Sequence, residues 1–120
     1  MLYSINMDAK YLLALEDGWG DDETATAYPP DHVERASLLA ESLCYLAKAP
    51  APIMTPAERD SIDLFWNKDY VGSVLINVPR NGSRATFSCH FFDEQEYGHF
   101  DNVHPATVLK FLIKLMGYSA

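Results

Sequence analysis

Basic side chains are scarce in this sequence. Its 120 residues include 9 Lys and Arg against 17 Asp and Glu, which gives a formal net charge of −8. Neither Lys nor Arg occurs from 11 to 34 or from 85 to 109. Binding to a nucleic-acid backbone depends on Lys and Arg, which displace condensed counterions. The composition therefore predicts that the protein makes no direct contact with nucleic acid.

Long apolar runs are absent too. None approaches the roughly 18 residues that a membrane-spanning helix needs. The first six residues lack the basic and apolar regions of a signal peptide, so we expect a cytoplasmic protein with no membrane contact. The only cysteines are Cys44 and Cys89. Both fall on expected buried faces, where a reduced thiol behaves as a small hydrophobe rather than half of a disulfide.

The acids gather in two segments, in the stretches that lack Lys and Arg. Fields of opposite sign steer proteins toward one another, so such segments favour a partner with a basic surface. The residues that we predict to bind this protein partner are Asp17, Asp21, Asp22, Glu23, Asp93, Glu94, Glu96 and Asp101.

The clearest local signal is Asn81-Gly82 between two β-rich runs. This dipeptide favours a two-residue hairpin turn, because both of its residues must adopt positive φ. Closing the turn sets the register of the hairpin and brings three pairs to one face, because side chains alternate along a strand. These pairs are Val78 with Ala85, Ile76 with Phe87, and Val74 with Cys89.

An earlier strand is expected over residues 61–67, joined to the hairpin by a turn at 68–70. Pairing Asn67 with Val71 would put Trp66 beside Gly72, whose small size leaves room for the indole. Ile62, Leu64 and Trp66 then share the buried face of a three-stranded antiparallel meander.

The opposite face of this sheet carries a mixed set of residues, neither a second core nor a plainly solvated surface. An antiparallel sheet can meet water or a partner on such a face. The members that we assign to this outer face as contact candidates are Asp63, Phe65, His90 and Phe92.

Helical periodicity predicts helices over 8–16, 31–47 and 105–116. Met7, Tyr11, Leu12 and Leu15 form the apolar stripe of the first. Asp31 with Glu34 would cap the second. With a short fourth strand near 97–100, the sequence predicts a single α+β domain over 1–120. Its element order is α-α-β-β-β-α, with a three- to four-stranded meander covered by helices.

The last helix is apolar around most of its circumference. The surplus falls on Phe111, Ile113 or Leu115 together with Tyr118. These side chains could cover the outer face of the sheet, or the same helix of a second chain. We favour the second arrangement, a homodimer through this helix, because two-fold dimers are the commonest assembly.

Histidines near the acidic segment raise the question of a metal. His90, His99 and His104 are interspersed with Asp93, but their spacing matches no compact zinc-ligand pair. Cys89 and His90 are adjacent on one strand and so point to opposite faces, which excludes a nucleophile–base pair. The sequence predicts no catalytic residues, no metal and no cofactor.

Several segments resemble a known group of proteins. They are Gly18-Trp19-Gly20-Asp21, Pro29-Pro30, the proline-flanked stretch 52–56 and the run 60–66 that ends at Trp66. Over roughly residues 12–78 the chain resembles a widespread group of small bacterial and phage proteins without an assigned function. Their pattern is a Gly-Trp-Asp-Gly-like loop, a helix, a proline-flanked connector and a strand ending near Trp. The order is reversed here at Gly20-Asp21, and the resemblance implies no chemistry.

These observations lead to ranked hypotheses. The first is a non-enzymatic binding module that docks on a basic surface of a protein partner; if that surface normally holds nucleic acid, the chain would inhibit the partner by competition. By size and charge the chain is similar to phage inhibitors of bacterial defence (anti-CRISPR proteins), and to immunity proteins or antitoxins, which form the first alternative. The second alternative is a small metal-dependent enzyme or sensor centred on His90, with Asp93, His99 or His104. A structural subunit of a larger assembly is a third.

Overall fold

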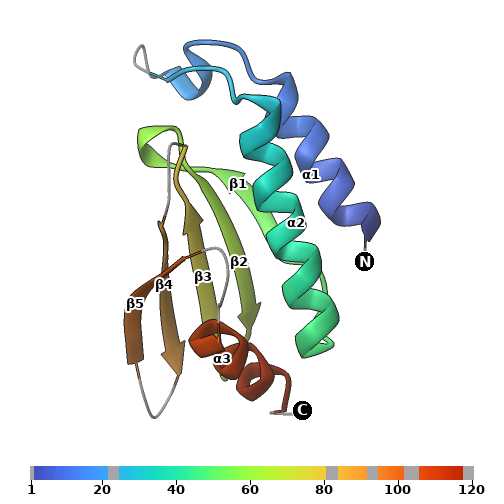
Figure 1. Ribbon diagram of the computed structural model, residues 1–120, viewed down its shortest axis with the longest axis vertical. Coiled ribbons are helices and arrows are strands. Elements are labelled where there is room, and N and C mark those ends of the chain that lie inside the picture. The colour runs from blue at the N-terminus through green and yellow to red at the C-terminus, as the bar shows by residue number, and fades with distance from the viewer. Residues whose placement is uncertain (1, 22–24, 81–83, 92–94, 102–105, 118–120) are drawn as a thin grey trace.

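The computed structural model describes residues 2–21, 25–80, 84–91, 95–101 and 106–117 (Figure 1). Five antiparallel strands form one sheet in which every strand pairs with the next along the chain. The strands are β1 Ile53–Pro56, β2 Ile62–Lys68, β3 Gly72–Val78, β4 Arg84–Phe91 and β5 Gln95–Asp101. The helices are α1 Leu2–Ala14, α2 Pro30–Ala47 and α3 Ala106–Gly117, with short 3₁₀ turns η1 Trp19–Asp21 and η2 Glu58–Asp60.

The α+β class and the antiparallel meander with helices before and after it are confirmed. The expected fourth strand near 97–100 is β5, which is longer than predicted. The structure adds β1, which the sequence analysis treated as part of a proline-flanked connector. Four residues ending in Pro56 carry too little alternation to indicate a strand. Only their pairing with β2 reveals one.

The register of the β3–β4 hairpin agrees with the sequence analysis. Val74 lies opposite Cys89, and Ile76 lies opposite Phe87. The inward-facing side chains form the centre of the core, together with apolar side chains of the helices. All the residues of these three strands that were expected to be buried are buried: Ile62, Leu64, Trp66, Val74, Ile76, Val78, Ala85, Phe87 and Cys89. Phe91 of β4 is also buried.

The predicted β2–β3 register was wrong by two residues. Trp66 lies opposite Val74, and Lys68, not Asn67, closes the turn opposite Gly72. Because side chains alternate with a period of two, this shift leaves every side chain on its predicted face. The space beside Gly72 is taken by β4. A Cβ at Gly72 would lie 2.5 Å from the His90 carbonyl oxygen and 2.8 Å from a carbon of the Phe91 ring.

Helix α1 begins at Leu2 rather than Asp8, and it buries a different face. Ile5 and Leu12 are fully buried, whereas Met7 and Tyr11, which were expected in the core, are exposed. Ile5 and Leu12 are seven residues apart, about two helical turns, so they share one face. The early start of the helix makes that face available.

The expected capping box of α2 does not form. The helix begins with Pro30 in its first turn, and its N-cap, Pro29, makes no side-chain bond. Proline suits this position because its missing N–H would have no helical partner. Ala36, Ala40, Leu43 and Ala47 of this helix are buried, whereas Leu46 is exposed.

The predicted apolar surplus of α3 is mostly absent. Phe111 and Leu115 are buried within the chain, and the Phe111 ring centroid lies 5.7 Å from that of Phe91. Ile113 is the exposed large apolar residue that the structure describes in this helix, while Tyr118 lies outside the described residues. One exposed isoleucine gives little support to a homodimer through α3. No helix in the described part of the chain is long and apolar enough to cross a bilayer.

Trp66 provides a test of the core. Its side chain is buried and its indole Nε1 donates a hydrogen bond to the Pro50 carbonyl oxygen at 2.9 Å. We expect Trp66→Ala to lower the free energy of unfolding by about 3–5 kcal/mol, because it leaves a cavity and removes the hydrogen bond to Pro50. Urea denaturation measures this loss. The control Tyr45→Ala, at an exposed position of α2, should change it by less than about 0.5 kcal/mol. A loss below about 1 kcal/mol for Trp66→Ala would contradict its place in the core.

Candidate functional site

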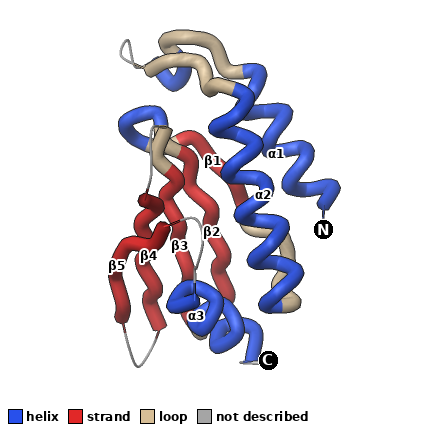
Figure 2. Tube along the Cα trace, viewed as in Figure 1, coloured by secondary structure: helices blue, strands red, loops and turns tan. Residues whose placement is uncertain are grey.

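One face of the sheet has no described helix on it. Figure 2 shows the helices gathered on one side of the strands, and the buried side chains of the meander point to that side. We call the opposite side the outer face. The strand register arranges its residues in three rows that cross the sheet.

The middle row of the outer face is apolar. Ile53 lies opposite Phe65, Phe65 opposite Leu75, and Leu75 opposite Ser88. Ile53 is 60% exposed, and Phe65 and Leu75 are partly exposed although they flank each other. Neighbouring apolar side chains across strands stabilise a sheet, but a helix normally covers such a row when it belongs to a core. This row instead faces away from the helices.

A polar row lies on one side of the apolar row. It runs from Thr55 through Asp63 and Asn77 to Thr86. The Asn77 Nδ2 donates to the Asp63 Oδ1 at 2.8 Å and to the Ser61 Oγ at 2.7 Å. Asp63 and Asn77, with residues 57–59 and 61, line a hollow of about 520 Å³. This row fixes a carboxylate beside the apolar row.

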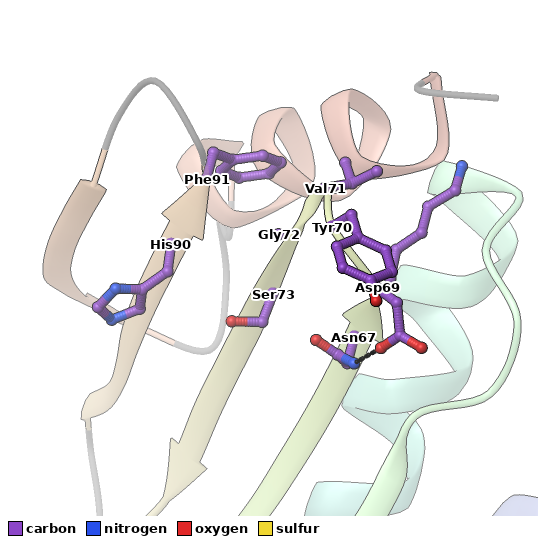
Figure 3. Close-up of a pocket in the computed structure, with 9 residues that line it drawn as sticks. Asn67, Asp69, Tyr70, Val71, Gly72, Ser73, His90 and Phe91 are labelled. Atoms are coloured by element: carbon purple, nitrogen blue, oxygen red, sulfur yellow. Dashed lines mark hydrogen bonds between the residues drawn. The ribbon is translucent and has the colours of Figure 1, made fainter. Parts of the chain in front are cut away.

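A second polar row lies on the other side, where Asn67 is opposite Ser73 and Ser73 is opposite His90. Figure 3 shows His90 and Ser73 on neighbouring strands, beside the turn that carries Tyr70. These residues line a hollow of about 370 Å³. A third hollow, of about 530 Å³, includes Ile53 and Phe65 of the apolar row. All three hollows therefore adjoin the outer face.

Tyr70 stands at the tip of the β2–β3 turn. Its side chain is fully exposed, and its φ of 66° is in the left-handed region. A residue with a Cβ pays about 1–2 kcal/mol for that conformation. A strained, fully exposed aromatic residue contributes no packing to the fold, and tyrosine is enriched among the residues that dominate protein interfaces. Tyr70 is thus a contact candidate that sequence reasoning assigned only to a turn.

The acids that we predicted to bind the partner are spread over the molecule. Asp17 and Asp21 belong to the α1–α2 connection at one end, and Glu96 lies near the other end, at the start of β5 (Figure 1). The Asp17 Oδ1 accepts a hydrogen bond from the Ala27 N–H at 2.8 Å, so this acid also holds its own loop. Asp101 lies opposite Arg84. The others, with one outer-face candidate, lie outside the described residues: Asp22, Glu23, Phe92, Asp93 and Glu94.

The structure does not bring the histidines together. His90 lies opposite Gln95, and His99 lies opposite Thr86, four positions further along β5. This separation corresponds to roughly 13 Å along the strands. His104 lies outside the described residues. Among the residues whose placement is described, no three His, Cys, Asp or Glu side chains form a group able to hold a metal ion.

A polar junction fixes the end of the sheet that adjoins the α1–α2 connection. The Asp60 carboxylate accepts hydrogen bonds from the Thr26 N–H at 3.1 Å and from the Thr26 Oγ1 at 2.8 Å. It also pairs with the Arg80 Nη1 at 3.2 Å, and Arg80 donates further bonds to Thr26 and Ala27. Sequence reasoning missed this junction because its members are 34 and 54 residues apart and match no motif.

His32 connects α2 to the same region. It is fully buried, and its Nε2 lies 2.9 Å from the Val78 carbonyl oxygen. A carbonyl only accepts, so the proton is on Nε2, and the buried Nδ1 has no hydrogen-bond partner. Burial lowers the pKa of His32 below its usual 6.5, and the positive charges of Arg35 and Arg80 act in the same direction. His32 is therefore a neutral core residue and no candidate ligand.

The lowered pKa makes stability depend on pH in a defined direction. Below pH 6.5 the unfolded chain protonates His32 more readily than the folded chain does, so the free energy of unfolding falls as the pH falls. Between pH 7.5 and pH 5.5 this single group should lower the free energy of unfolding by up to about 1 kcal/mol. His32→Gln should flatten that part of the pH profile measured by urea denaturation. Leu38→Gln, at an exposed position of the same helix, should keep the wild-type slope. Equal slopes in all three proteins would contradict the assignment.

Tyr70→Gly should not weaken the fold. Glycine relieves the left-handed strain and loses more chain entropy on folding, so the free energy of unfolding should stay constant or rise by up to about 1 kcal/mol. In the same turn, Asp69 has no positive φ, so Asp69→Gly should lower the free energy of unfolding by about 0.5–1 kcal/mol. Thermal and urea denaturation compare the two variants. A clear loss for Tyr70→Gly would mean that the tyrosine ring supports the fold.

Comparison of the chain with models of protein families, with curated proteins and with solved structures finds no match.

Proposed function

We propose that this chain is a non-enzymatic binding module that engages a protein partner through the outer face of its sheet. The observation that supports this proposal is the apolar row of Ile53, Phe65 and Leu75, set between two polar rows on a face without a described helix. An apolar centre with a polar rim is the usual anatomy of a protein interface. Tyr70 stands at the margin of this face and adds an aromatic contact.

The negative charge of the chain favours a partner with a basic surface. The chain carries a net charge of −8, and Asp63 lies within the polar row that borders the apolar one. A partner with basic residues around an apolar patch would complement this surface and would be attracted to it over a distance. If that basic surface normally holds nucleic acid, the chain competes with the nucleic acid and inhibits the partner. An immunity protein or antitoxin would use the same surface against a toxin, and the partner's identity distinguishes these roles.

The test begins with a partner that co-purifies from the source cells and is then purified and recombined with the chain. Calorimetry measures its Kd. We expect Ile53→Lys to raise the Kd by about tenfold or more, because it adds a charge of the partner's own sign to the apolar row. Leu38→Lys is the matched control. It makes a comparable change at a residue of α2 that is 54% exposed, and it should shift the Kd by less than about twofold.

Salt provides an independent readout of the same complex. Raising the salt concentration from about 0.15 M to 0.5 M should weaken binding, since it screens the attraction between exposed charges. The proposal is wrong if the recombined complex is indifferent both to Ile53→Lys and to salt. It is also wrong if the purified chain turns over a substrate with residues of the outer face.

A further inference from the structure

The two edges of the sheet differ in how they are closed. Strand β1 has four residues, ends at Pro56, and lies beside α1 (Figure 1). The Asp8 Oδ2 of α1 accepts a hydrogen bond from the Met54 N–H at 2.9 Å. A carboxylate, a proline and a covering helix are devices that protect an edge strand from pairing with another chain. The β1 edge is therefore closed.

The β5 edge has neither a proline nor a covering helix in the described part of the chain. All seven residues of β5 pair with β4, and β5 ends the strand order of the sheet. No described helix runs alongside it in Figure 1. In a regular strand, every second residue directs its N–H and C=O away from the paired neighbour. The far side of β5 therefore offers a seven-residue template for another strand.

From this difference between the edges we infer that β5 is where an extended, basic segment of the partner adds as a sixth strand. The inference rests on the proposed function, and it names how the partner is held. Main-chain hydrogen bonds would supply affinity, and alternate side chains would supply specificity. Tyr97 lies opposite Ser88 at the end of the apolar row, so an added strand would extend the outer face.

Charge favours a basic segment over a second copy of this chain. The β5 sequence contains Glu96 and Asp101 and no Lys or Arg. In the register of the sheet, Glu96 lies opposite Cys89 and Asp101 lies opposite Arg84. A strand with several Lys or Arg residues would complement these two acids. A second copy would bring its own charge of −8 to the same edge.

A synthetic peptide can test strand addition without the natural partner. The probe is a capped seven-residue peptide that alternates lysine with valine and threonine, titrated into the full chain while the β5 amide resonances are followed by NMR. Two further peptides carry N-methyl groups on alternate amides, one on each edge of the extended peptide. N-methylation removes donors and leaves the charge unchanged. We expect one methylated peptide to lose at least about tenfold in affinity and the other to bind like the parent. Equal binding by all three would show charge attraction alone and would overturn the inference.

Proline substitutions test the same edge from the side of the protein. Tyr97 and Gly98 are neighbours, so the N–H of one faces β4 and that of the other faces the open side. We therefore compare Tyr97→Pro with Gly98→Pro. The variant that removes the N–H on the open side should keep the fold and lose peptide binding. Retained binding by this folded variant would contradict strand addition. If both variants unfold, the methylated peptides still decide.

The outcomes separate this inference from the proposed function. If the edge proline leaves the Kd of the natural partner unchanged while Ile53→Lys raises it, the binding module stands and strand addition is wrong. If neither variant and no change in salt alters that Kd, both are wrong. Light scattering provides a further check: a mass near twice that of the chain, lost in the edge-proline variant, would show that a second copy occupies β5 and would overturn the choice of a basic partner.

Discussion

The alternation of side chains along the meander decides which face of the sheet the helices cover. It directs the apolar residues of β2, β3 and β4 to one side, where Trp66, Ile76 and Phe87 are buried. Helices α2 and α3 pack against these apolar residues and shield them from water, while α1 packs beside β1 and α2. The same alternation places Phe65 and Leu75 on the other side, where no described helix covers them. The outer face is therefore a direct consequence of how the core is made.

A second set of contacts holds the helix layer to the sheet at one end. His32 and Arg35, one turn apart on α2, bind the carbonyl groups of Val78, Pro79 and Arg80 at the end of β3. Arg80 then reaches Asp60 and the Thr26 loop. Each group is polar and partly or fully buried, so each needs its partner, and the loss of one would leave the others unsatisfied. These bonds connect α2 and the Thr26 loop to the end of the sheet that bears Asp63 and Asn77.

The proposed function depends on the outer face and the β5 edge of the sheet more than on the acidic segments. The acidic segments remain part of the proposal because they set the long-range field. However, Asp17 also holds its own loop, and the described acids belong to opposite ends of the molecule. Apolar residues in register and an open strand provide the short-range contacts that acids alone lack. Tyr70 had no signal in the sequence beyond its place in a turn, because left-handed strain is visible only in the backbone.

Features encoded within a few neighbouring residues could be predicted from the sequence. Asn81-Gly82 and the flanking alternation were enough for the register of Val74 with Cys89 and for the division of the strands into two faces. Features that depend on contacts between distant segments became visible only in the folded chain. They include the two-residue shift of Trp66, the pairing of β1, the burial of Phe111 and the junction of Asp60 with Arg80. The physical reason is that alternation is unchanged by a shift of two, and burial depends on which surface arrives from elsewhere in the chain.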